Sequence, residues 1–580
     1  MSASLSPVMS ATAKSAATTP TADLDRAVAA VRARAQAFAR LSPRAKADLL
    51  RECMPRIQEV AQGWVDAGCR AKGIDPTSHT AGEEWFGGPV ITMRNTRLLV
   101  DSLEQIARSG KPASGTGSKV NAHGRVEVGV YPGNALEGVV FQGFTSHLLM
   151  QDGVTPANLR SRQAVFYDKK DPSGGVCVIL GAGNVAAIPA TDMLYKMFVE
   201  GYVCVLKINP VNEWVGPFLE RAFEPLIARD YVRVTYGGGD VGAYLCEHKE
   251  VDDIHITGSD RTHDLIVWGP PGPERERRMK DNDPKLKKTI TSELGNVSPV
   301  AVVPAQYTDD ELWFQARNIA SMVANNGSFN CNAAKMLILA KGWGQRDQFL
   351  TMIGRALSAA QTRRAYYPGA FDRYRDLTAG MARVEKFGEA SDSKLPWTII
   401  RDVDAAVTDH KLFRTEPFCG ILSQTEIGST DPSEFIRALV PFANDQVWGT
   451  LNATIIIHPR LEKDPVVGKE LQIALRDLKY GTVAINHWPA LGYGMVTPAW
   501  GGHPSATLQN IQSGLGWVHN TYMFESIDKT VVRGPLVAKP KPAWFYDNRK
   551  SALVASRMVP FFANPSWFKL PGLVFQALRG

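Results

Sequence analysis

The sequence predicts an α/β protein built from two open, parallel-sheet domains, and two observations carry this prediction. Between Gly175 and Thr257, short apolar runs alternate with helical stretches, a pattern typical of a parallel sheet covered by helices on both faces. A second α/β unit follows from about Leu294 to Arg460. The chain has 580 residues, more than one compact core normally uses, so two or three domains are expected.

Composition excludes several classes of protein. The chain is 44% hydrophobic and 21% charged, as is usual for a soluble globular protein. Its net charge of +7 is spread along the chain without a compact basic domain, so nucleic-acid binding is not expected. The seven cysteines are far apart and form no Cys-x-x-Cys pair. They therefore predict neither a metal site nor a disulfide framework, but a reducing, cytoplasmic location. No apolar run approaches the roughly 20 residues that span a bilayer.

The first 131 residues are predicted to be a leader, a helical region and a strand. Residues 1–22 are rich in Ala, Ser and Thr and lack the apolar core of a signal peptide, which predicts a disordered leader. From Asp23 to about Ala71, apolar residues recur at spacings of three and four, which indicates helices. Val126 to Tyr131 is predicted to be a strand, with a turn at Pro132-Gly133.

The middle of the chain supplies the repeated strand–helix units. In the first α/β unit we expect strands at 176–180, 203–208, 232–236 and 253–257, and helices at 190–200, 214–228 and 241–248. The segment 268–288 interrupts the alternation with prolines and a charged run, and is predicted to be a solvated loop insertion. In the second unit we expect strands at 300–303, 336–339 and 454–457.

The segment beyond Pro535 is basic and aromatic. We expect it to pack on its own chain or on a neighbouring subunit. The alternative is peripheral contact with a membrane surface, which the prolines make less favourable because they break any long amphipathic helix.

Cys331 and Glu293 are the first candidate catalytic residues. The small polar residues around Cys331 indicate a loop, and Glu293 lies on a segment bounded by Gly and Pro. A thiol and a carboxylate in such settings can form a pair for covalent catalysis, in which the thiolate attacks and the carboxylate activates water. The alternative is a thiol that packs in the core, as free cysteines commonly do.

A glycine-rich turn at Gly181-Ala182-Gly183-Asn184 follows a strand and precedes a helix, the setting of a dinucleotide-binding fingerprint. Ala186 stands at its final position, and Lys207 replaces the acidic residue expected at the end of the second strand. An ordinary turn is the alternative. The side-chain amide of Asn184 can donate to a developing oxyanion or can cap a helix.

Further candidate ligand-binding residues lie at strand ends and turns. Lys207 can donate to a ribose or phosphate, or simply extend into water. Gly258 and Ser259 follow a strand, where backbone N–H groups suit a pyrophosphate, although such a sequence is also an ordinary turn. Glu416 and Phe418 share one local turn that could serve a ribose and a nicotinamide face, or could be a surface turn.

In combination these residues resemble the aldehyde dehydrogenase superfamily over roughly Asp23 to Val532, as a divergent member with long N- and C-terminal extensions. The strings that carry the resemblance occur in the family's order. They are the run from Gly237 through Thr257-Gly258-Ser259, Glu293-Leu294-Gly295 with Ser298-Pro299, Asn326-Gly327 leading to Cys331-Asn332-Ala333, Glu416-x-Phe418, Gly481-Thr482-Val483-x-Ile485-Asn486, and Trp500-Gly501-Gly502.

The resemblance implies a subunit of three parts that assembles as a homodimer or homotetramer. Residues 23–293 would be the nucleotide-binding domain, with part of a small oligomerisation element near 150–175. Residues 294–500 would be the catalytic domain. Residues 501–580 would return to the core, complete the oligomerisation element and end in the basic, aromatic tail.

The resemblance also implies the role of each site residue in NAD- or NADP-dependent oxidation of a small aldehyde to a carboxylic acid. It makes Cys331 the nucleophile, Glu293 the general base and Asn184, with the Cys331 N–H, the oxyanion hole. It assigns Lys207 to the adenosine ribose, Gly258 and Ser259 to the pyrophosphate, and Glu416 to the nicotinamide ribose, with Phe418 packing nearby. It implies no metal.

Three departures from the family pattern bear on this reading. One additional residue lies between Gly327 and Cys331. Pro210 replaces the acidic residue expected after Lys207, which leaves NAD and NADP open, and His263 replaces a second glycine. The alternative functions are a CoA-acylating dehydrogenase or acyl-CoA reductase and a non-catalytic scaffold. Glu293 favours hydrolysis, since the CoA-dependent class typically lacks that carboxylate.

The aromatic residues Phe329, Trp488, Tyr493 and Trp500 lie near the family's substrate-tunnel or active-site segments. They predict an apolar or aromatic aldehyde, with filling of the core as the alternative.

Overall fold

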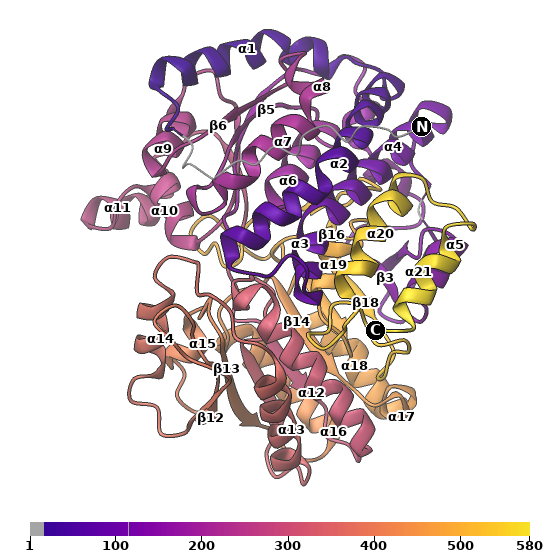
Figure 1. The fold of residues 1–580 in the computed structure, drawn as a ribbon, viewed down its shortest axis with the longest axis vertical. Coiled ribbons are helices and arrows are strands. Elements are labelled where there is room, and N and C mark those ends of the chain that lie inside the picture. The colour runs from indigo at the N-terminus through magenta and orange to yellow at the C-terminus, as the bar shows by residue number, and fades with distance from the viewer. Residues whose placement is uncertain (1–16, 114) are drawn as a thin grey trace.

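The structure is a computed structural model that describes residues 17–113 and 115–580. It contains a five-stranded sheet, an eleven-stranded sheet and a two-stranded ribbon, with helices packed around them. Figure 1 shows the five-stranded sheet in the upper half of the molecule and most of the eleven-stranded sheet in the lower half. The α/β class predicted from the sequence is confirmed.

Helices form the N-terminal part of the chain, as predicted. Ser42 caps the second helix by accepting a hydrogen bond from the Ala45 N–H, and Gly73 ends it in the left-handed conformation at φ 68°. The elements are α1 (Thr21–Ala39), α2 (Pro43–Lys72), η1 (His79–Ala81), α3 (Gly82–Trp85), η2 (Phe86–Val90) and α4 (Ile91–Ser109).

The predicted leader extends too far. Residues 1–16 lie outside the described residues, but α1 already begins at Thr21, and the Thr19 N–H donates to the Tyr236 carbonyl at 3.0 Å. The prediction of disorder is therefore wrong for residues 19–22, because they bond to the edge of a sheet and begin a helix.

The five-stranded sheet is wholly parallel and has the order β6-β5-β4-β7-β8. Its four predicted strands are confirmed to within one residue at each end. The strands are β4 (Val176–Leu180), β5 (Val203–Lys207), β6 (Val232–Thr235), β7 (Asp253–Thr257) and β8 (Thr289–Glu293). The helices between them are α6 (Ile188–Phe198), η5 (Pro210–Val215), α7 (Gly216–Ala222), α8 (Glu224–Ile227), α9 (Gly239–Glu247) and α10 (Asp260–Trp268). The chain changes direction across the sheet between β4 and β7, where ligands of such folds bind.

The insertion 268–288 differs from the prediction. It contains a helix, α11 (Pro273–Asp281), that begins with a proline at a position where the missing N–H costs nothing. Arg277 and Arg278 pair with Glu274 one turn earlier, and none of the helix is buried. The prediction of a loop is wrong, while the prediction of solvent exposure is confirmed.

The eleven-stranded sheet has a parallel centre and antiparallel edges. Its order is β1-β2-β3-β18-β15-β14-β9-β10-β13-β12-β11, and the three strands predicted for the second unit correspond to β9, β10 and β14. The strands from β15 to β11 in this order are β9 (Pro299–Val302), β10 (Met336–Ala340), β11 (Val384–Phe387), β12 (Trp397–Val403), β13 (Ile421–Ile427), β14 (Asn452–Ile456) and β15 (Thr482–Ile485). The helices are α12 (Asp309–Ala324), η6 (Asn325–Ser328), α13 (Arg346–Ala359), α14 (Ala370–Thr378), α15 (Lys411–Arg414), α16 (Pro432–Pro441), η7 (Phe442–Gln446), α17 (Pro459–Lys463), α18 (Pro465–Asp477) and α19 (Ala490–Gly494).

The edge of the large sheet that begins with β1 combines distant parts of the chain. The strand β18 (Ile527–Arg533) pairs with β15 on one side and with β3 on the other. Residues 117–150 therefore join the sheet of the second unit, although the sequence places them in the nucleotide-binding part. Residues 151–175 hold loops and two 3-10 helices, and their role in oligomerisation stays a prediction. The remaining elements of this region are β1 (Gly117–Val120), β2 (Val126–Tyr131), α5 (Ala135–Val140), β3 (Thr145–Met150), η3 (Leu159–Arg162), η4 (Val165–Asp168), β16 (Ala499–Trp500) and β17 (Val518–His519).

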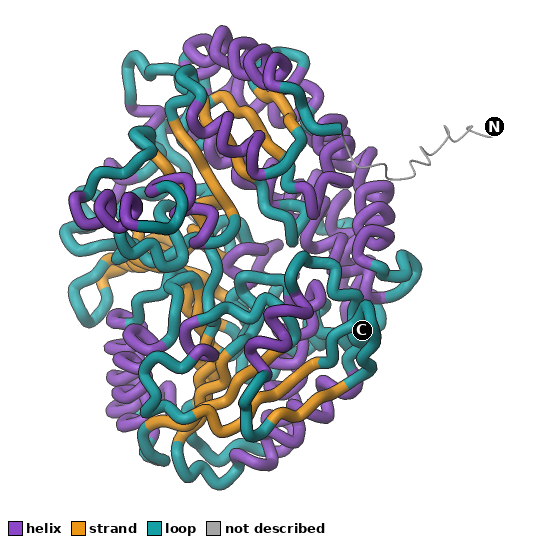
Figure 2. The backbone as a smooth tube through the Cα atoms, turned by 90° about the vertical axis from the view of Figure 1, so that its left-hand side faces the viewer, coloured by secondary structure: helices purple, strands orange, loops and turns teal. Residues whose placement is uncertain are grey.

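The C-terminal segment packs on its own chain, which confirms the first alternative predicted for it. Its helices are α20 (Ser551–Ala563) and α21 (Leu570–Ala577), and both lie on one side of the molecule in Figure 1, while Figure 2 marks the C-terminal end. Buried side chains of α20, among them Met558 and Phe562, belong to the same apolar core as α2 and α4. Within the described part of the chain, no helix has the length and apolar character needed to cross a membrane.

Candidate active site

Cys331 and Glu293 meet between the two sheets. Glu293 is the last residue of β8 and is 2% exposed, and the Cys331 thiol donates a hydrogen bond of 3.1 Å to its Oε1. Cys331 follows a tight loop in which Asn326, Gly327 and Ser328 all have left-handed backbones. Three such residues in succession are uncommon. The pair predicted from the sequence is therefore within hydrogen-bonding distance.

The surroundings raise the pKa of both groups. Burial raises the pKa of Glu293 to about 7, and the negative charge of Asp192 adds to this effect. Burial also holds the pKa of the Cys331 thiol well above its usual value, and the neighbouring Glu293 acts in the same direction. The ammonium of Lys335 opposes the increase at Cys331. A carboxyl whose pKa is near neutrality can both accept and return a proton under physiological conditions.

Hydrogen bonds to its carbonyl fix the backbone of Cys331. Ser298 Oγ and Lys335 Nζ each donate to the Cys331 carbonyl oxygen at 3.0 Å, and Asn452 Nδ2 donates at 3.4 Å. Lys335 Nζ also forms an ion pair with Glu416. Among the described residues the Cys331 N–H has no acceptor, so it remains available to a ligand.

Asn184 contacts the loop that leads to Cys331 and lies at the start of the segment that leads into α6. Its side chain is 6% exposed, and Nδ2 donates to the Phe329 carbonyl at 2.9 Å, which leaves the second amide hydrogen for another acceptor. Its own carbonyl accepts from Lys72 Nζ at 3.1 Å and from Asn326 Nδ2 at 3.0 Å. These bonds hold Asn184 next to the Cys331 loop, as an oxyanion-binding pair requires.

A groove of about 1500 Å³ runs from this pair along the carboxyl ends of the five-stranded sheet. All the residues predicted to bind a cofactor line it, namely Lys207, Gly258, Ser259, Glu416 and Phe418. Lys207 is 7% exposed, and no carboxylate among the described residues lies within ion-pair distance of its ammonium. An unpaired, largely buried cation in a groove with glycine-rich walls fits the phosphates or ribose of a dinucleotide.

Two of the predicted cofactor-binding residues are already engaged by the protein. The Gly258 N–H donates to the Glu293 carbonyl at 3.0 Å, so the free N–H groups here are those at the start of α10, which Ser259 caps. Glu416 accepts from the Asn296 N–H at 3.2 Å in addition to its pair with Lys335. Its second oxygen remains for a ribose hydroxyl.

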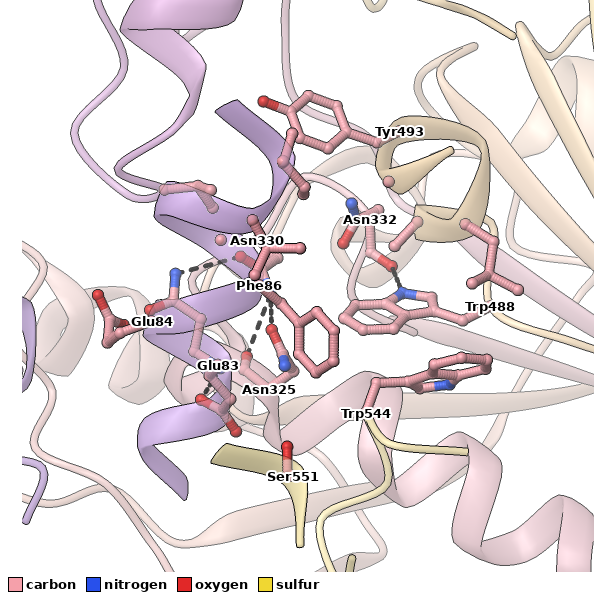
Figure 3. A pocket seen from close by; sticks show the side chains of 18 of the residues that line it. Glu83, Glu84, Phe86, Asn325, Asn330, Asn332, Trp488, Tyr493, Trp544 and Ser551 are labelled. Carbon is pink, nitrogen blue, oxygen red and sulfur yellow. Dashed lines mark hydrogen bonds between the residues drawn. The ribbon is translucent and has the colours of Figure 1, made fainter. Parts of the chain in front are cut away.

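A second cavity opens on the other side of the Cys331–Glu293 pair. It has a volume of about 180 Å³, and its walls come from η2, α4, the Cys331 loop, α19 and the C-terminal segment. Cys331 and Glu293 line both this chamber and the groove. Figure 3 shows Phe86, Trp488 and Trp544 around its interior. A nucleophile at the junction of two cavities can meet a substrate from one and a cofactor from the other.

Comparisons with known proteins bear on the family and the fold. A family model described as the aldehyde dehydrogenase family matches residues 139–365, which include Asn184, Glu293 and Cys331. This part of the chain is similar to the aldehyde dehydrogenase family.

Solved structures of the superfamily share the fold across most of the chain. An NADP-dependent glyceraldehyde-3-phosphate dehydrogenase from Bacillus halodurans, complexed with NADP, is 15% identical with a TM-score of 0.60, over 88% of this chain and 90% of that one. An NAD-dependent aldehyde dehydrogenase from Sinorhizobium meliloti is 18% identical with a TM-score of 0.59, over 90% of this chain and 89% of that one. A 4-trimethylaminobutyraldehyde dehydrogenase from Oryzias latipes is 25% identical over 179 residues, which are 30% of this chain and 32% of that relative.

The four aromatic residues singled out in the sequence have different positions in the structure. Trp488 and Tyr493 line the chamber. Phe329 is 1% exposed and packs against Tyr366, Tyr367 and Phe418, and Trp500 is fully buried with its ring against Tyr493. Two of the four residues therefore line a cavity and the other two fill the core, while contact with a substrate stays a prediction.

Sequence reasoning missed several polar residues around the pair. Lys335 lies four residues beyond Cys331, and a lysine directly before an apolar strand could have drawn attention to it. Asp192 is a buried residue of α6 and accepts from Thr257 Oγ1 at 2.7 Å, with His255 Nε2 at 3.4 Å from the same oxygen. No local pattern marks Asp192, because its partners lie on a strand more than 60 residues away.

Proposed function

We propose that this chain oxidises an aldehyde to a carboxylic acid with NAD or NADP as the electron acceptor. The observation that carries the proposal is the 3.1 Å contact between Cys331 Sγ and Glu293 Oε1 at the point where the groove and the chamber meet. The groove fits a dinucleotide, and a bound NAD or NADP would accept a hydride there.

The reaction begins with the proton of the Cys331 thiol passing to Glu293, which leaves a thiolate. The thiolate attacks the carbonyl carbon of an aldehyde in the chamber and forms a thiohemiacetal. Asn184 Nδ2 and the Cys331 N–H donate to the oxygen that becomes negative. Loss of hydride from the carbon leaves a thioester on Cys331.

Hydrolysis of the thioester completes the cycle. Glu293 first releases the thiol proton to solvent, and it then takes a proton from water while the oxygen attacks the thioester carbonyl. The carbon–sulfur bond breaks, the acid leaves and the proton returns to the Cys331 thiolate. A carboxylate at this position supports water over CoA as the acyl acceptor.

The test is an assay of the purified protein with NAD or NADP and a panel of aldehydes. Absorbance of the reduced nicotinamide should appear with the wild type and be lost in Cys331→Ala. Activity that requires added CoA would favour acyl transfer to CoA instead. Absence of both turnover and nucleotide binding would instead support a non-catalytic scaffold.

Two further expectations from the sequence stay predictions. The chain is predicted to assemble as a homodimer or homotetramer, and its location is predicted to be cytoplasmic. Size-exclusion chromatography with light scattering and fractionation of the source cells test them.

A further inference from the structure

The lysine and arginine side chains around the chamber are neutralised by acidic partners. Each of them has such a partner within ion-pair distance, and both members of each pair are largely buried. Separating such a pair leaves an uncompensated buried charge, which is strongly unfavourable. The wall therefore offers no spare lysine or arginine to an anionic substrate. The pairs are Lys72 with Glu84 at 2.8 Å, Arg363 with Glu83 at 2.8 Å and Arg94 with Glu137 at 2.7 Å.

Three aromatic rings face the interior of the chamber. Figure 3 shows Phe86 from η2, Trp488 from the loop before α19, and Trp544 from the C-terminal segment around one space. The Trp488 indole is held in place because its Nε1 donates to the Asn332 carbonyl at 2.7 Å. Aromatic faces of this kind bind apolar and aromatic bodies by contact area and by ring stacking.

The size of the chamber limits what can enter. Its volume of about 180 Å³ is close to the roughly 150 Å³ of an engineered cavity that binds benzene. One aromatic ring, or an alkyl chain of similar volume, fills such a space.

The C-terminal segment forms one wall of the chamber and is tightly fixed there. Tyr546 donates its N–H to Ser321 Oγ at 3.1 Å, and its carbonyl lies 3.1 Å from His79 Nε2. At the start of α20, Ser551 lies so close to Gly82 that a Cβ on the glycine would be 2.1 Å from Ser551 Oγ. Met558 and Phe562 continue the wall along α20. These contacts fix the segment as part of the chamber wall.

We propose that residues 544–562 are the specificity wall of the substrate chamber, which takes uncharged aldehydes with a body about the size of one aromatic ring. The proposal rests on the proposed function, because it names the substrates of the same Cys331 site. Trp544 limits the depth of the chamber, and the internal ion pairs exclude aldehydes that carry a carboxylate or phosphate group.

The experiment compares kcat/KM for benzaldehyde, a series of linear aldehydes of increasing length, and succinic semialdehyde as a charged probe. The wild type should prefer benzaldehyde and medium linear aldehydes, at least tenfold over the charged probe. Trp544→Ala should raise KM for benzaldehyde about tenfold, as expected from the loss of ring contact. It should also move the best linear substrate to a longer chain while kcat for short aldehydes stays within about twofold.

The matched control is Trp567→Ala, which removes an indole from the same segment at a position that is 57% exposed and outside the chamber wall. It should leave every kcat/KM unchanged. Trp544→Phe, a milder change, should shift the preferred chain length in the same direction by a smaller amount. It replaces Trp544→Ala in the test if that variant fails to fold. An unchanged length profile in both Trp544 variants, or a preference for the charged probe, overturns the proposal.

A binding assay separates this proposal from the proposed function. Benzyl alcohol, which fits the chamber but is not an aldehyde, should slow alkylation of Cys331 by iodoacetamide in the wild type and in Trp567→Ala, and less in Trp544→Ala. Protection without turnover of any aldehyde supports the chamber and refutes the oxidation. Turnover without any difference in protection between the variants refutes the assignment of residues 544–562 as the specificity wall.

Discussion

At the scale of single residues, the surroundings of Glu293 set the pKa of its carboxyl group. It sits at the end of a strand, is almost fully buried, and has the Cys331 thiol as its hydrogen-bond donor. Removal from water disfavours the charged carboxylate, which raises its pKa to about 7. The base form required for hydrolysis therefore exists above that pH and is lost below it.

The first prediction concerns the pH dependence of thioester hydrolysis. The rate should rise with pH and level off above about 7, because Glu293 must be unprotonated to accept a proton from water. Glu293→Gln should lower the rate roughly 10²–10⁴-fold and remove this step from the profile. Mass spectrometry after rapid mixing should show the acyl group accumulating on Cys331. A profile that keeps the same step in Glu293→Gln would assign it to another group.

The second prediction concerns Asp192, whose negative charge contributes to the raised pKa of Glu293. Asp192→Asn keeps the shape of the side chain and removes the charge, so the pKa of Glu293 should fall. The rising limb of the pH profile should move to lower pH while the plateau is retained. A limb at the same pH as in the wild type would show that burial alone sets the pKa. Thr257→Val, which removes the hydrogen bond to Asp192 but not the charge, is the matched control.

At the scale of elements, the strands were predictable and the connections among side chains were not. β4 is a continuous apolar run and β7 alternates isoleucines with polar residues, and turn residues follow both, so their sequences alone located them within one residue. α11 was missed because prolines and charges resemble a loop, although Pro273 begins a helix and Glu274 pairs with arginines one turn later. Cys331 and Glu293 were identifiable from sequence order. Lys335, Asp192 and the tail wall depend on contacts over long separations, which no local pattern records.

The third prediction concerns the packing of α20 on α3. Gly82→Ala places a methyl group against Ser551 and the backbone of Ala552, so the helices must shift apart. The free energy of unfolding should fall by about 1–3 kcal/mol, as for other overpacked cores. Denaturant unfolding measures it.

Gly344→Ala is the control for this change, since a Cβ at Gly344 meets no atom within 4 Å. It should leave the free energy of unfolding nearly unchanged. An equal decrease in the free energy of unfolding in the two variants would mean that the decrease at Gly82 comes from the change in backbone freedom. It would then not come from the contact with α20.

At the scale of the whole molecule, the reactive thiol lies where the two sheets, the groove and the chamber converge. The other six cysteines are buried in the cores, and Cys331 alone among the seven is partly exposed. Access to solvent and to ligands thus distinguishes one thiol from six of the same type.

The fourth prediction follows from this difference. Limited treatment of the native protein with iodoacetamide should modify one cysteine per chain, and peptide mapping should identify it as Cys331. After unfolding in denaturant, all seven should react. The raised pKa of the thiol means that native alkylation should be slow near neutral pH and speed up as pH increases. Rapid modification of a second cysteine in the native state would contradict this arrangement.

η2 and α20 line the same chamber, although the ribosome makes them at different times. During synthesis, Phe86 emerges early and Cys331 near the middle, while Trp544 and α20 come from the last tenth of the chain. A chain released or cut before residue 544 would carry every catalytic group with its substrate chamber open to water. Completion of the C-terminus is therefore the event that closes the site.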